Sequence, residues 1–229
     1  AFRFGLVAGL IHYLSLLYWL VPTMSIYGKI PAWLAVIIIL LFCGFLALYF
    51  GAIAWSFSRL GTTPPFAALW FPVLWVAAEY TRAFLFSGFP WGLLGHSQYG
   101  RLALIQLADL TGAYGLSFLI AGANFGFALI VAAATRSSWR GSVVSWRLAV
   151  INSVVLVSVF GAVYYYGANR LDTIDQLQAG AAGTKIAAIQ GNIAQSDKWD
   201  DAYKNKTIEI YNRLSGGIIS QKPELIVWP

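Results

Sequence analysis

Few side chains in this sequence could carry chemistry, and the two that stand out are an acid and a base. Glu79 and Arg82 lie three positions apart inside a long apolar run, so on a helix they would share one face. Ionisable residues within a membrane span are costly to bury and often functional. Two interpretations stand: a pair of functional residues, or an ion pair that fixes how helices pack.

The other reactive residue types are isolated. His12 lies in the middle of an apolar run, which is typical of a hydrogen bond between helices, whereas His96 precedes Ser97 and Gln98 and could face a polar cavity. Cys43, the single cysteine, has apolar neighbours, whereas a catalytic thiolate needs a polar, partly wet setting. We therefore interpret Cys43 as a lipid-facing or helix-facing residue, and we expect no metal site and no cofactor.

An aromatic turn, Phe89-Pro90-Trp91, follows the Glu79 region. Proline fixes the turn, and the two rings present a flat apolar surface. Such a surface suits contact with a lipid acyl chain or the shaping of a lateral opening; an aromatic anchor at the interface is the alternative. The surrounding segment 87–111 predicts a re-entrant or interfacial element, which is tolerated at that depth only under a cover of protein or a watery cavity.

The elements that must position these residues are membrane helices. Of 229 residues, 59% are apolar and only 10% are charged, whereas soluble domains carry about 25% charged residues. Stretches of about 20 apolar residues are long enough to span a bilayer. The sequence predicts a transmembrane domain over residues 1–170 with five spans: 4–21, 33–57, 65–86, 112–134 and 148–167.

The charges indicate how these spans are oriented. Arg136, Arg140 and Arg147 share one joint that contains no acid. If that joint is cytoplasmic, the last span runs outward and the residues after Gly167 lie outside the cytoplasm. Topology therefore explains the basic excess, and we expect no nucleic-acid partner because no basic run is interleaved with aromatic residues.

The chain changes character from Lys185 onward, where acids and bases almost balance. Lys185 to Gln190 is typical of a short buried strand, and the apolar positions from Trp199 to Leu214 predict a helix that Gly216-Gly217 would end. A second strand, residues 224–228, follows. Strand, helix and strand open an α/β sheet, and the working residues of such sheets lie at the carboxyl ends of the strands.

Four motifs occur in a fixed order along the chain. They are Phe89-Pro90-Trp91 with Ser97-Gln98, Gln190-Gly191-Asn192-Ile193 with Gln195-Ser196, Lys198-Trp199-Asp200, and Leu225-Ile226-Val227-Trp228-Pro229. Together they resemble the apolipoprotein N-acyltransferases of bacterial inner membranes. The resemblance implies a polytopic α-helical membrane domain followed by the first β-α-β of an α/β nitrilase-like (CN hydrolase, α-β-β-α sandwich) domain, incomplete here, over residues 185–229.

The resemblance also implies a reaction, the last step of lipoprotein maturation. Family members move an acyl chain from a phospholipid, usually phosphatidylethanolamine, to a Cys thioester. They then transfer it to the α-amino group of the lipidated N-terminal Cys of a lipoprotein. The partners would thus be this phospholipid donor, a diacylglyceryl-lipoprotein acceptor and the membrane.

The family's catalytic residues would all lie outside this chain. The Glu that acts as general base would directly follow Pro229, the Lys and the Cys nucleophile would come further downstream, and Cys43 does not match that Cys. We therefore expect this chain alone to be inactive. The resemblance places the protein in the bacterial inner (cytoplasmic) membrane as a multi-pass protein, with the nitrilase-like domain in the periplasm.

The residues that the resemblance carries over support a site and are not themselves catalytic. Trp199 matches a Trp that the family needs for activity. Gln190 and Asn192 match the strand-end motif and would order loops, and Phe89, Pro90 and Trp91 match the membrane-interface motif. Two alternatives remain open, a transporter fragment and a non-enzymatic lipoprotein-binding membrane scaffold, and the residues that follow Pro229 would discriminate between them.

Overall fold

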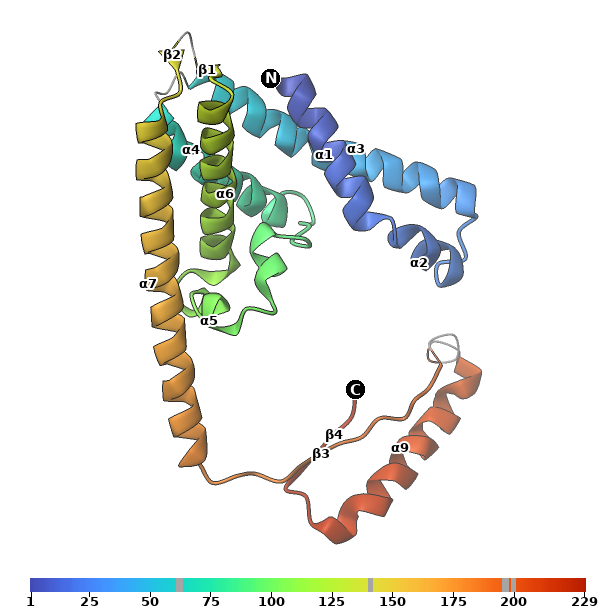
Figure 1. The fold of residues 1–229 in the computed structure, drawn as a ribbon. Coiled ribbons are helices and arrows are strands. Elements are labelled where there is room, and N and C mark those ends of the chain that lie inside the picture. The colour runs from blue at the N-terminus through green and yellow to red at the C-terminus, as the bar shows by residue number, and fades with distance from the viewer. Residues whose placement is uncertain (61–63, 140–141, 195–197, 199–200) are drawn as a thin grey trace. The chain divides into compact units, whose positions relative to one another are not determined.

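The computed structural model describes residues 1–60, 64–139, 142–194, 198 and 201–229. These form two compact units, Ala1–Asp175 and Gln176–Pro229, which we describe separately. The first unit is helical (Figure 1). Its elements are α1 (Phe2–Leu17), α2 (Leu20–Ile26), α3 (Ala32–Arg59), α4 (Pro64–Phe84), the 3-10 helix η1 (Leu94–Gln98), α5 (Leu102–Ile105), α6 (Ala108–Ala134), β1 (Ser138–Trp139), β2 (Ser142–Val143) and α7 (Trp146–Ala179), whose last turn enters the second unit.

Three helices within the described residues, α3, α6 and α7, are long and apolar enough to cross a membrane. The bent pair of α1 and α2 makes a fourth if it is counted as one span. The sequence predicted five, and α4 accounts for the difference. Glu79 and Arg82 lie in the last two turns of α4, and their charges lower its average hydropathy.

Two helices depart from straight spans. Where the sequence predicted one helix over residues 4–21, the chain bends by 47° between α1 and α2. The bend precedes Pro22, which has no backbone N–H to donate and therefore fits best in the first turn of a new helix. In α6, Gly112 has a φ of 63°, a conformation that a Cβ disfavours, so continuous helical backbone begins only after it.

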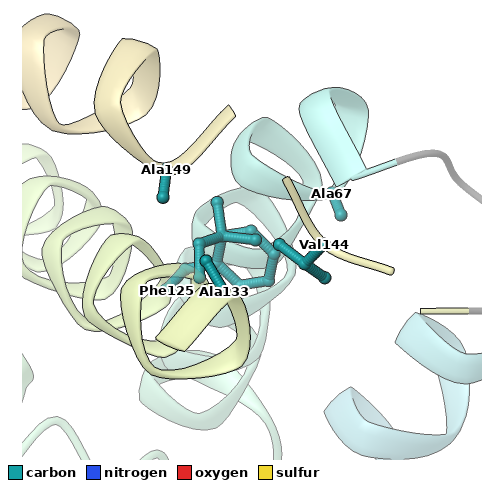
Figure 2. Packing of buried hydrophobic residues seen from close by; sticks show 6 residues of the cluster. Ala67, Phe125, Ala133, Val144 and Ala149 are labelled. Atoms are coloured by element: carbon teal, nitrogen blue, oxygen red, sulfur yellow. The ribbon is translucent and has the colours of Figure 1, made fainter. Parts of the chain in front are cut away.

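The first unit packs through two apolar clusters. One joins α1 and α3 and comprises Tyr13, Leu17, Ile39, Cys43 and Leu46. The other, shown in Figure 2, gathers residues of α4, of α6, of the link between β2 and α7, and of the start of α7: Ala67, Phe125, Leu129, Ala133, Val144 and Ala149. Polar contacts add a further tie between α6 and α7, because the Asp109 carboxylate accepts hydrogen bonds from the Tyr166 hydroxyl and Arg170 Nε.

The second unit contains a parallel strand pair and a helix. Its elements are β3 (Ile186–Ala188), η2 (Asp201–Tyr203), α9 (Lys204–Ile218), η3 (Ile219–Gln221) and β4 (Leu225–Val227). Strands β3 and β4 pair in parallel, with Ile186 opposite Leu225 and Ala188 opposite Val227. Parallel neighbours need a crossover connection, and α9 lies in that connection.

The predicted helix end at Gly216-Gly217 is wrong. Helix α9 continues to Ile218 and passes into η3, and the helical stretch stops at Lys222, whose φ of 49° is left-handed. Lys222 precedes Pro223, and the residue before a proline disfavours the α-helical region. Two glycines near the end of a helix lower its stability, by about 1 kcal/mol each, without ending it.

Candidate functional site

The irregular segment 87–98 of the first unit is held by polar side chains of α4. Glu79 is only 6% exposed. Its Oε1 accepts a hydrogen bond from the backbone N–H of Leu94 (2.7 Å) and another from Trp75 Nε1 (3.0 Å). Carboxylates that accept N–H donors at such distances make strong, charge-assisted hydrogen bonds. One end of η1 is thereby attached to α4.

Arg82 attaches the same segment at a second point. Its side chain is 3% exposed, and Nη1 donates a hydrogen bond to the backbone oxygen of Trp91 (2.7 Å). Its own backbone oxygen accepts from the N–H of Phe89 (2.9 Å). The guanidinium carbon lies 5.7 Å from the centroid of the Tyr13 ring and 5.8 Å from that of Phe89, within the range of a cation–π attraction.

Glu79 and Arg82 do not form a salt bridge with each other. Among the described residues, a nitrogen of a basic side chain and a carboxylate oxygen lie within 4.0 Å of each other only in the pair Arg170 and Asp109. The side chains of Glu79 and Arg82 bind backbone atoms of segment 87–98 instead. This result corrects the ion-pair interpretation of the sequence. The second carboxylate oxygen of Glu79, Oε2, is buried without a hydrogen-bond partner, beside a cavity of about 20 Å³ that His12 and Tyr49 also line.

A third anchor comes from α6. The backbone N–H of Gly95 donates to Ser117 Oγ (2.9 Å), and the Ser117 side chain is fully buried. A Cβ at residue 95 would collide with the backbone oxygen of Ala113, so η1 approaches α6 as closely as a glycine allows. Ser117 is a functional residue that the motifs of the sequence do not single out, although a small polar residue within an apolar span is a known signal of helix contact.

The aromatic residues of segment 87–98 divide between interior and surface. The Phe89 ring meets the Phe42 ring of α3 edge-on, with centroids 4.9 Å apart. The Trp91 ring stacks on Trp19, with centroids 5.6 Å apart, and remains 52% exposed. Pro90 is exposed between them. Protein therefore covers the backbone of this turn while Pro90 and Trp91 face outward.

Two of the three predicted site residues of the second unit lie in the segment that follows one strand of the pair. Gln190 and Asn192 follow β3, and Trp228 follows β4. Because the strands are parallel, their carboxyl ends share an edge. The backbone N–H of Ile189 donates to the oxygen of Val227 (2.9 Å), so the pairing continues up to that edge.

Contacts with α9 complete this edge. The Trp228 ring stacks on Tyr211, with centroids 5.2 Å apart, and Trp228 Nε1 donates to Ser215 Oγ (2.9 Å). Gly191 lies against the Tyr211 ring, where a Cβ would be crowded. Gln190 and Asn192 are exposed, and Asn192 adopts a left-handed φ of 49°. Tyr211 falls within the stretch whose apolar spacing predicts the helix, and that spacing gives no sign of its contacts with Gly191 and Trp228.

The remaining candidates divide between described and undescribed residues. Trp199 lies outside the described residues, so its predicted supporting role stays a prediction. Cys43 is fully buried in the cluster between α1 and α3, whereas His96 is exposed on η1. Across the described parts of the chain, no three His, Cys, Asp or Glu side chains come close enough to hold a metal ion.

Comparisons with known proteins point to one family. Residues 1–126 match the model of the apolipoprotein N-acyltransferase N-terminal domain. Over its whole length the chain is 41% identical to the apolipoprotein N-acyltransferase of Geobacter metallireducens, of which it covers 42%. It is 32% identical to that of Pseudomonas putida, with 93% of this chain and 39% of the relative covered.

A more distant relative gives the same result. The apolipoprotein N-acyltransferase of Chromobacterium violaceum is 28% identical over 94% of this chain and 39% of its own length. The chain thus spans less than half the length of these curated relatives. With a matching family model over more than half of its residues and helices that suit an integral membrane protein, the chain belongs to the apolipoprotein N-acyltransferase family.

Proposed function

We propose that the protein containing this chain is a phospholipid:apolipoprotein N-acyltransferase of the bacterial inner membrane. The observation that carries the proposal is the match along the whole chain to relatives named apolipoprotein N-acyltransferase. In this proposal, residues 1–170 are the transmembrane domain and residues 185–229 open a nitrilase-like domain on the periplasmic side. The Arg-rich joint between α6 and α7 supports that orientation.

The chemistry follows a two-step acyl transfer. A Cys thiolate attacks an ester carbonyl of phosphatidylethanolamine, the lysophospholipid leaves, and a thioester remains on the enzyme. The free α-amino group of the diacylglyceryl-cysteine then attacks the thioester, which yields an amide and regenerates the thiol. A Glu relays the protons, and a Lys stabilises the oxyanion of each tetrahedral intermediate.

The strand edge of the second unit supports the placement of this chemistry. The proposed Glu would be the residue after Pro229, directly beyond the carboxyl end of β4, where Trp228 is fixed by Tyr211 and Ser215. Gln190 and Asn192 end the neighbouring strand at the same edge. In α/β sheets, ligands bind outside the carboxyl ends of the strands. Trp199 is proposed as a further supporting residue.

A transfer assay on the full-length protein tests the proposal. Phosphatidylethanolamine with a labelled acyl chain is supplied with a diacylglyceryl lipopeptide that has a free amino terminus. We expect the label to appear in an amide on the lipopeptide. Replacement of the downstream Cys by Ser should abolish transfer, and the 229-residue chain alone should transfer nothing.

Three possible results would each contradict a different part of the proposal. A full-length protein that binds both lipids without moving the label would refute the enzyme and leave a lipoprotein-binding scaffold. Transfer that survives the loss of the Cys would refute the thioester route. Transfer by the 229-residue chain would refute the proposed catalytic groups downstream of Pro229 and place them within these 229 residues.

A further inference from the structure

Segment 87–98 has an unusual dependence on two charged side chains. It contains only one short 3-10 turn, so no regular ladder of hydrogen bonds sets its position. Arg82 and Glu79 hold it at two points only three residues apart, the oxygen of Trp91 and the N–H of Leu94. The orientation of the intervening turn therefore depends on α4.

Burial of these two charges is expensive, and ordinary helix packing does not require it. A carboxylate and a guanidinium moved out of water each lose much of their solvation free energy. A mutual salt bridge would offset part of that loss, yet the two side chains diverge to separate backbone atoms. The two side chains therefore fix the backbone at Trp91 and Leu94 and do not form a direct ion pair.

The fixed backbone carries the part of the segment that faces outward. Arg82 binds the carbonyl of Trp91 itself, and the Trp91 ring is half exposed next to exposed Pro90. In a membrane unit, an exposed apolar surface of this kind meets lipid chains. A shift of the Trp91 backbone would displace that surface directly, because only the Cα and Cβ atoms separate the carbonyl from the ring.

We propose that Glu79 and Arg82 are positioning residues that hold Pro90 and Trp91 as a preformed contact surface for the acyl chains of the phospholipid donor. The inference rests on the proposed function. It assigns the two charges to binding of the donor and not to the chemical steps or to the lipoprotein acceptor. Positioning groups of this kind lower the cost of bringing a substrate to the reacting group.

The test is steady-state kinetics of the full-length enzyme in nanodiscs, in which the mole fraction of phosphatidylethanolamine and the concentration of lipopeptide are varied separately. Glu79→Ala should raise the KM for the donor by roughly 10- to 100-fold and leave the KM for the lipopeptide unchanged. Glu79→Gln should restore most of the donor affinity, because an amide oxygen still accepts from Leu94 N–H. Thr81→Ala, on the same turn but exposed, is the matched control and should change neither constant.

A double-mutant cycle separates positioning from general stability. Trp91→Ala should raise the same KM, and the combination with Glu79→Ala should add little more, because both changes act on one surface. If the alanine variant does not fold, Arg82→Lys carries the test, since lysine keeps one donor for Trp91 O but loses the planar contact with the rings. It should raise the donor KM and leave the lipopeptide KM unchanged.

The outcomes distinguish the two proposals. A wild-type enzyme without acyl transfer refutes the proposed function and this inference with it. A wild-type enzyme that transfers normally, with variants whose donor and acceptor constants change equally or whose effects add to that of Trp91→Ala, refutes the positioning role alone.

Discussion

Two irregular segments of this chain differ in what contacts their backbone. In segment 87–98 of the first unit, Leu94 N–H, Gly95 N–H and Trp91 O bind buried side chains of α4 and α6. In residues 189–194 of the second unit, Gln190 and Asn192 are exposed, and an aromatic ring covers the backbone at Gly191.

In the topology proposed above, segment 87–98 lies at the bilayer and residues 189–194 lie in water, and we attribute the difference to these two solvents. A backbone group within a bilayer has no water to bind, so an irregular turn there needs internal partners. Outside the bilayer, water satisfies exposed groups, and side chains at a strand end remain available for ligands or further chain. We therefore expect substitutions of equal size to cost more in segment 87–98 than at the strand edge.

The largest effect is expected for Gly95→Ala. The new Cβ would collide with the oxygen of Ala113, a backbone atom that moves only if α6 moves. We expect a loss of about 3 kcal/mol in the free energy of unfolding, measured by denaturant titration of the full-length protein in micelles. Gly100→Ala is the control, because open space surrounds Gly100. Equal losses for the two variants would contradict the close approach of η1 and α6.

The second-largest loss of stability is expected for Ser117→Ala. It leaves the buried N–H of Gly95 without an acceptor, a change that costs about 1–2 kcal/mol. Hydrogen exchange at the Gly95 amide should accelerate accordingly. Ser153→Ala removes a hydroxyl that donates to a carbonyl of its own helix and should cost less. If Gly95 exchanges at the same rate in the Ser117 variant and the wild type, the hydrogen bond does not protect the segment.

Trp228→Phe tests the strand edge. The ring stack on Tyr211 is kept, and only the hydrogen bond from Nε1 to Ser215 is lost. We expect a loss of about 0.5–1 kcal/mol in local stability, read as faster exchange of the β3 and β4 amides. Ser215→Ala removes the acceptor of the same hydrogen bond and should cause an equal loss in local stability. A much larger loss of local stability for either variant would contradict the comparison. It would show that the strand edge depends on this one hydrogen bond as strongly as segment 87–98 depends on its hydrogen bonds to buried side chains.

The smallest effect is expected for Asn192→Gly. Asn192 has a left-handed φ, which glycine adopts without strain at the expense of greater freedom in the unfolded chain. The two contributions should leave the stability within about 0.5 kcal/mol of wild type, whereas Asn192→Ala should lose about 1 kcal/mol. If glycine and alanine have equal effects, the side chain of Asn192 and not its backbone conformation matters for folding.

Much of the membrane unit follows from apolar run length. The run at residues 33–57 predicts a helix that the structure extends to Ala32–Arg59, because twenty or more apolar residues have few alternatives in lipid. The bend after Leu17 does not follow from hydropathy, since α1 and α2 are both apolar. It depends on the local effect of Pro22, which a hydropathy average does not register.

The site was harder to predict than the helices. The spacing of Glu79 and Arg82 indicates a shared face, yet it says nothing about whether the two bind each other or a third group. Their actual partners are the backbone N–H of Leu94 and the backbone oxygen of Trp91. Every residue type supplies a backbone oxygen, and every type except proline supplies an N–H. The end of the helix was also hard to predict from local residue types. It depends on Lys222 and Pro223 and not on Gly216-Gly217.

The burial of Cys43 has a practical consequence. Its side chain has no accessible surface between α1 and α3, so a bulky maleimide reagent cannot reach its sulfur while the helices stay packed. In the full-length folded protein, the stoichiometry of labelling would therefore count only the thiols outside this cluster. A single reactive thiol that is shielded by a non-hydrolysable acyl donor would then identify the nucleophile by mass spectrometry, without any need to mutate Cys43.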